Sequence, residues 1–133
     1  MKIIYEGFFV NPRIELKGTL DKDIEFKHIT TEFRPHETHE HLYGINARFR
    51  VCGYGNDGNN EGILVELIYC ENRELVDLYN NISRPHITLS ISNDSKPQYT
   101  SNIEFTDDIP SYIDETIDCV FGGFVGRPML QTE

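Results

Sequence analysis

The chain has 133 residues and a formal net charge of −10, from 12 basic and 22 acidic residues. This length suits a single domain, residues 1–133, that can bury a core without disulfides. The acidic balance disfavours a protein that binds long DNA or RNA, although it leaves room for a small nucleotide in a local pocket.

The cysteines and the N-terminus favour a cytoplasmic protein. Cys52, Cys70 and Cys119 occur singly and far apart, which predicts reduced, buried thiols rather than a disulfide framework. Residues 1–6 are interrupted by Glu6 and lack the apolar core of a signal peptide. No apolar run approaches the ~18 residues of a membrane span, so no membrane partner is expected.

The first third of the chain predicts two strands and a loop. Residues 2–10 are rich in β-forming residues, and residues 26–34 alternate until Pro35 ends the pattern. Residues 13–24 have no clear period. Residues 35–41 are polar and aperiodic, which predicts a loop.

The middle of the chain predicts a hairpin and then a helix. Residues 43–52 alternate, and residues 63–70 are apolar on both faces, as in a central strand. The glycine-rich residues 53–62 between them predict a long connecting loop. Residues 72–82 carry an apolar stripe at helical spacing, typical of a short amphipathic helix.

The last third predicts two further strands. Residues 84–92 alternate without a break, and residues 112–121 alternate well enough for another strand. Residues 95–102 between them predict a loop. The tail from Gly122 is glycine-rich, and we expect it to fray.

One face of two predicted strands carries a histidine and a threonine. His-Ile-Thr occurs at 28–30 and again at 86–88, and alternate residues of a strand share a face. Two such strands side by side would place two imidazoles on opposite sides of one phosphodiester. One imidazole would accept a proton and the other donate one, while the hydroxyls donate hydrogen bonds to the phosphate oxygens.

This pair of motifs resembles the two-histidine (2H) phosphoesterase superfamily. The second motif, His86–Leu89, fits fully, and the first has Thr31 where an apolar residue is usual. The resemblance implies a compact, two-lobed α+β fold of mostly antiparallel β-sheets with few short helices. It implies His28 and His86 as catalytic residues, Thr30 and Thr88 as phosphate-binding residues, and no cofactor.

Other residues near the ends of the motif strands are candidates for substrate binding. Cations there would steady phosphate charge, and aromatic rings would stack on a base. The cations and tyrosines considered as possible substrate contacts are Arg34, Arg84, Lys96, Tyr99 and Tyr54; Tyr43 and Phe124 are further candidates for stacking.

A run of three histidines at His36, His39 and His41 suggests zinc, since imidazoles are good ligands for it. The spacing matches no zinc motif, because His-Glu-x-x-His is absent. A solvated loop is the simpler interpretation, and we expect no metal.

The sequence therefore predicts a metal-independent phosphodiesterase for a small nucleotide: a 2′,3′-cyclic phosphate, a 2′-5′ linkage or a cyclic nucleotide signal. The alternative is a module of the same fold that binds a nucleotide without cleaving it. A third possibility is a β-rich structural protein in which the two motifs coincide by chance. No long nucleic acid is expected as a partner, and the oligomeric state is left open.

Overall fold

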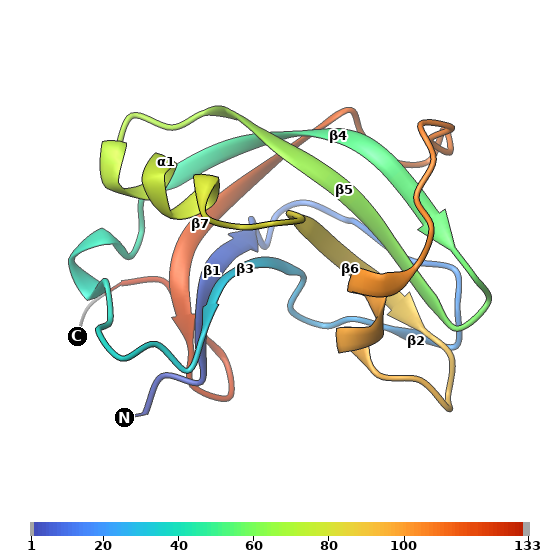
Figure 1. Cartoon of the computed structure of the whole chain (residues 1–133), viewed down its shortest axis with the longest axis horizontal. Coiled ribbons are helices and arrows are strands. Elements are labelled where there is room, and N and C mark those ends of the chain that lie inside the picture. The colour runs from blue at the N-terminus through green and yellow to red at the C-terminus, as the bar shows by residue number, and fades with distance from the viewer. Residues whose placement is uncertain (1, 132–133) are drawn as a thin grey trace.

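A computed structural model describes residues 2–131, and its strands form one antiparallel sheet (Figure 1). The strand order is β2-β6-β5-β4-β7-β1-β3, with β8 paired to β7. The strands are β1 (Tyr5–Val10), β2 (Lys22–Asp23), β3 (His28–Phe33), β4 (Asn46–Asn56), β5 (Asn60–Tyr69), β6 (His86–Ile91), β7 (Thr116–Phe124) and β8 (Pro128–Met129). The helices are α1 (Arg73–Asn80) and two 3₁₀ segments, η1 (Glu40–Leu42) and η2 (Pro97–Asn102).

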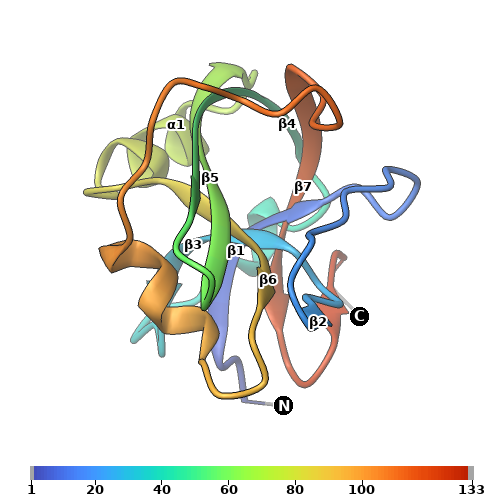
Figure 2. The ribbon, with the colours of Figure 1, turned by 90° about the vertical axis from the view of Figure 1, so that its right-hand side faces the viewer.

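The expected mostly antiparallel β structure with few short helices is confirmed. The strands form one continuous hydrogen-bonded path. The long strands β4 and β5 arch over the others, and η2 lies against β6 (Figures 1 and 2). This curvature also brings β3 beside β6, although the two are far apart in the strand order.

The core lies on the inner face of the curved sheet. Phe8, Phe49 and Phe121 come from three neighbouring strands and are fully buried. The ring centroid of Phe8 lies 5.1 Å from that of Phe49 and 5.4 Å from that of Phe121, in edge-to-face contacts. Ile29 and Ile87, the middle residues of the two motifs, are also fully buried, so the alternation predicted from the sequence is confirmed at both motifs. It does not hold along the whole of either strand, because Phe33 at the end of β3 is exposed and Ser90 on β6 is fully buried.

The predicted helix at 72–82 is confirmed as α1. The side chain of Asn72 accepts a hydrogen bond from the backbone N–H of Leu75 at 3.0 Å, which satisfies one of the free donors at the helix start. Leu75 is fully buried, and Tyr79 packs on Phe49 with ring centroids 5.9 Å apart. None of the helices in residues 2–131 is long and apolar enough to cross a membrane.

The prediction of a long loop at 53–62 is wrong. β4 continues to Asn56 and β5 begins at Asn60, so the connecting turn is short. Glycine occurs inside these strands because other chain segments approach closely: a Cβ on Gly55 would lie 2.4 Å from the carbonyl oxygen of Glu104. The expected fraying from Gly122 is wrong for the same reason, since β7 runs to Phe124 and Gly122 is buried against β8.

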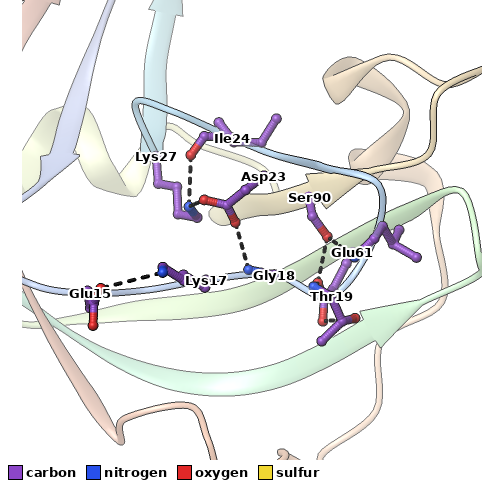
Figure 3. Close-up of polar contacts among 10 residues, drawn as sticks. Glu15, Lys17, Gly18, Thr19, Asp23, Ile24, Lys27, Glu61 and Ser90 are labelled. Carbon is purple, nitrogen blue, oxygen red and sulfur yellow. Dashed lines mark hydrogen bonds and ion pairs between the residues drawn. The ribbon is translucent and has the colours of Figure 1, made fainter.

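Residues 13–24, which had no clear period, form an irregular segment with only the two-residue β2 (Figure 3). The backbone N–H of Thr19 donates to Glu61 Oε1 at 2.6 Å, and the N–H of Gly18 donates to Asp23 Oδ1 at 2.8 Å. Lys27 Nζ donates to the other Asp23 oxygen at 2.8 Å. Side-chain acceptors therefore hold this segment against the sheet in place of the hydrogen bonds of a helix.

The expectation of buried thiols holds for one cysteine of three. All three are free, but only Cys119 is buried, whereas Cys52 and Cys70 are partly exposed. Cys119 faces the core from β7, and burial raises the pKa of its thiol. The other two lie in and just after strands whose second face reaches solvent.

Each motif strand pairs with a strand that carries Glu-Gly at a β-bulge. On β1 the register shifts between Glu6 and Gly7, and Gly7 pairs with Thr30. On β5 it shifts between Glu61 and Gly62, and Gly62 pairs with Thr88. A Cβ on Gly7 would lie 2.2 Å from the carbonyl oxygen of Ile29, and one on Gly62 would lie 3.0 Å from that of Ile87. The two motifs therefore sit in matching local frameworks.

We expect Gly7→Ala to destabilise the fold by about 1–3 kcal/mol, because the added Cβ forces the backbone of β3 away from β1. Urea unfolding followed by circular dichroism would measure the change. Gly53→Ala is the matched control, because its Cβ meets only the side chain of Leu64 at 3.0–3.2 Å. Equal stability of the Gly7→Ala protein and the wild type would contradict the close approach.

Candidate functional site

β3 and β6 bring both motifs to one cavity of about 610 Å³. His28, Thr30, His86 and Thr88 all line it, as the alternation of the two strands predicts. The remaining lining residues come mainly from the start of β1, the segment before β3, η2 and the end of β7: Tyr5, Ile24, Glu25, Phe26, Phe33, Pro97, Gln98, Ser101 and Phe124.

The ring of His28 is fixed by a backbone carbonyl. Its Nδ1 lies 2.9 Å from the carbonyl oxygen of Phe26. Because a carbonyl oxygen only accepts, Nδ1 carries the proton of the neutral ring. The hydroxyl of Tyr5 lies at 3.3 Å from the same nitrogen, and its ring stacks on the imidazole with centroids 4.4 Å apart. Nε2 is left as the free lone pair of the neutral ring.

The ring of His86 is held in the same way. Its Nδ1 lies 2.8 Å from the carbonyl oxygen of Arg84, again two residues earlier in the chain. In both motifs, therefore, the proton of the neutral imidazole is on Nδ1 and Nε2 is available to a ligand in the cavity that the two rings share.

The environment of His28 favours its neutral form. Burial lowers the pKa of His28; the hydrogen bond to the Phe26 carbonyl offsets part of that change, and the charge of His86 adds to it. Both imidazoles line the same cavity, so their charges lie close enough to interact. His28 is therefore suited to accept a proton at neutral pH.

The two threonines place hydroxyls beside the imidazoles. Thr30 is exposed to the cavity, and Thr88 is partly exposed. The hydroxyl of Thr88 donates to the carbonyl oxygen of Pro97 at 3.4 Å, a long and therefore weak hydrogen bond. A phosphate oxygen, which is a stronger acceptor, would compete for this donor readily.

Aromatic rings form one wall of the cavity. Tyr5 stacks on Phe124 with centroids 4.9 Å apart and an interplanar angle of 10°. Phe26 lies 6.1 Å from Phe124, so the rings run continuously from His28 outward. The sequence does not predict that Tyr5 and Phe26 line a cavity, because ordinary strand and core packing explains such residues equally well. Phe124 was considered for stacking, and it does line the cavity.

The three cations proposed as substrate contacts do not line the cavity. Arg84 Nη1 donates to the carbonyl oxygen of Ser101 at 3.1 Å, and its guanidinium lies over the ring of Phe105. Arg34 itself has a left-handed backbone conformation, with φ of 52°, and its guanidinium lies over the ring of Phe33. Lys96 precedes η2, where its carbonyl oxygen accepts from Asn60.

The tyrosines proposed as contacts also lie elsewhere. Tyr54 is inside β4 rather than at a loop tip, and its hydroxyl donates to the buried carboxylate of Glu61. Tyr99 is an exposed residue of η2 that does not line the cavity. Tyr43 is buried, where its hydroxyl donates to Glu6 at 2.7 Å. The positions of Tyr54 and Tyr43 therefore depend on buried carboxylates in other elements of the fold.

The histidine run after β3 is spread over separate partners. His39 bonds Glu6 through Nδ1 at 2.8 Å, and His41 bonds Glu74 of α1 through Nε2 at 3.0 Å. His36 is exposed. Across residues 2–131, no group of three or more His, Cys, Asp or Glu side chains is arranged to hold a metal ion.

No protein-family model matches the chain, and comparison with curated proteins finds none with significant similarity. The geometry of the cavity is therefore the basis for any functional assignment.

We expect His28 to titrate at a lower pH than an ordinary histidine, because burial and His86 both oppose its protonation. Replacing His86 with Gln removes the second effect, so the pKa of His28 should rise towards its ordinary value. NMR titration of the imidazole resonances would measure both changes. His36→Gln, on the exposed loop, is the control; an unchanged His28 titration in His86→Gln would contradict the proximity of the two rings.

Proposed function

We propose that this chain is a phosphodiesterase that cleaves small nucleotide diesters by acid–base catalysis with His28 and His86. One observation carries the proposal. Two imidazoles on different strands line one cavity, and a backbone carbonyl two residues earlier holds the Nδ1 of each, which leaves both Nε2 atoms to the ligand. A histidine that only stabilised the fold would not require a second histidine, oriented in the same way, in the same cavity.

The reaction needs two proton transfers. Nε2 of neutral His28 accepts a proton from the attacking water as its oxygen bonds to phosphorus. The phosphorus–oxygen bond to the leaving group breaks, and protonated His86 gives its Nε2 proton to that oxygen. The products are a phosphomonoester and an alcohol, joined in one molecule when the substrate is a cyclic phosphate. His28 takes the role of base because burial favours its neutral form.

Thr30 and Thr88 supply hydrogen-bond donors for the non-bridging phosphate oxygens. Both hydroxyls lie on the cavity side of their strands, beside the histidines. The negative charge on these oxygens grows as the attacking oxygen adds, so the donors bind the transition state more tightly than the substrate.

The shape and chemistry of the cavity favour a nucleotide as the substrate. A volume of about 610 Å³ is within the usual range for small-molecule sites. The rings of Tyr5, Phe26 and Phe124 offer faces and edges on which a base would pack. Candidate substrates are a 2′,3′-cyclic phosphate, a 2′-5′ linkage and a cyclic nucleotide; the acidic chain disfavours long RNA.

Replacing either histidine with Ala should lower kcat about 100- to 10,000-fold, because a general acid or base contributes that much. The measurement is turnover of a panel of cyclic and 2′-5′ nucleotides, with thermal unfolding as a check on the fold. Thr30→Val and Thr88→Val should lower kcat less than the histidine variants, because each removes one donor and leaves the proton transfers intact.

His36→Ala is the control for these variants, because His36 is exposed on a loop and does not line the cavity. Full activity of His28→Ala or His86→Ala would rule out the mechanism. Binding of the panel without turnover by the wild type would instead favour the alternative, a nucleotide-binding module.

The dependence of kcat/KM on pH should be bell-shaped, since one imidazole must be neutral and the other protonated in the same turnover. The lowered pKa of His28 should place the acid limb below the ordinary titration range of histidine.

Activity should also persist in EDTA, because two imidazoles and two hydroxyls suffice for the chemistry. Activity lost in EDTA and restored by zinc or manganese would contradict this mechanism.

A further inference from the structure

The cavity has an unusual charge for a phosphate site. Among the described residues that line it there is no lysine and no arginine, and Glu25 contributes a carboxylate. The positive charge available to a ligand is therefore that of an imidazolium. One imidazolium balances the single negative charge of a phosphodiester, but not the further charge of a phosphomonoester.

Glu25 lines a second cavity as well as the first. The second cavity has a volume of about 370 Å³ and shares Glu25 and Phe26 with the first. Its other lining residues are mostly apolar. A ligand that fills the histidine cavity therefore lies near Glu25, which lines that cavity.

The nearest lysine does not neutralise Glu25. Lys27 is the next but one residue and also lines the second cavity, but only 8% of its side chain is exposed. Its Nζ donates to Asp23 Oδ2 and to the carbonyl oxygen of Ile24, both at 2.8 Å. Glu25 itself is exposed.

We propose that Glu25 is a specificity-determining residue that selects ligands whose only charge is one phosphodiester and rejects those that carry an additional phosphomonoester. The inference rests on the proposed function, because it assigns the histidine cavity to the scissile phosphate. Glu25 acts by repulsion: the second phosphate of a rejected ligand finds no lysine or arginine among the described lining residues and meets the Glu25 carboxylate in the same cavity.

The test compares adenosine 2′,3′-cyclic phosphate with the same nucleotide carrying a 5′-phosphate. We expect the wild type to prefer the first by about tenfold in kcat/KM, the size of a like-charge repulsion in a partly solvated site. Glu25→Gln keeps the shape of the side chain and removes its charge, so the preference should fall to about twofold. Glu25→Lys should abolish or reverse it. Higher salt should weaken the preference in the wild type.

Glu104→Gln is the matched control. It changes the net charge of the chain by the same amount, but Glu104 is exposed and lines a different cavity, with Tyr54 and Asp57. The preference should therefore stay at the wild-type value. Equal use of both nucleotides by the wild type, or the same preference in Glu25→Gln as in the wild type, would overturn the role of Glu25.

Calorimetric binding of the same two nucleotides separates this inference from the proposed function. In one outcome, the wild type turns over neither nucleotide but binds the nucleotide without a 5′-phosphate about tenfold more tightly, and Glu25→Gln loses this difference. That result would rule out catalysis and support the selectivity. Turnover of both with equal kcat/KM retains the phosphodiesterase and removes the selectivity. Binding of neither nucleotide overturns both.

Discussion

Two buried carboxylates, Glu6 and Glu61, hold the frameworks in which the motif strands lie. Glu6 accepts from the backbone and ring of His39 and from Tyr43, which fixes the loop after β3. Glu61 accepts from Thr19 in the segment before β3 and from Ser90 on β6. Fully buried carboxylates are tolerated only when so many donors surround them. The positions of both motif strands therefore depend on acceptors outside the cavity.

The same two strands, β1 and β5, also determine how deeply the isoleucine of each motif is buried in the core. The glycine that follows each carboxylate lets the carbonyl of the middle isoleucine approach, so Ile29 and Ile87 enter the core completely. With each isoleucine fixed inside, the residues on either side must face the other way, toward the cavity. A hydrogen bond from Nδ1 to the carbonyl two residues back then orients each ring. In both motifs, therefore, the orientation of the histidine depends on the buried isoleucine, which in turn depends on the glycine and the carboxylate of the neighbouring strand.

Local patterns predicted the parts of this arrangement that depend on one strand or helix alone. The two-residue period of 84–92 and the helical stripe of 72–82 report burial of one face, which any folded context must satisfy. The glycines at 53–62 were misread because glycine signals a turn or a close approach equally well, and only the partner segment decides. The predictions for Tyr5 and Arg84 were wrong in opposite ways for the same reason: Tyr5 lines the cavity but was not predicted to, and Arg84 was predicted as a contact but does not line it. Whether a side chain lines a cavity is decided by residues distant in the sequence, and the sequence does not place them.

The charge of the site is set locally against an acidic background. A chain of net charge −10 whose cavity is lined by imidazoles, hydroxyls and aromatic rings attracts an anion only when an imidazole is protonated. In the proposed mechanism, the proton that attracts the phosphate is also the one that the leaving oxygen needs, so binding and acid catalysis would depend on the same ionisation. Because burial favours the neutral form of His28, the proposed mechanism assigns the base to His28 and the acid to His86. Burial of one imidazole would thus allow two like residues to take different roles in the proposed mechanism.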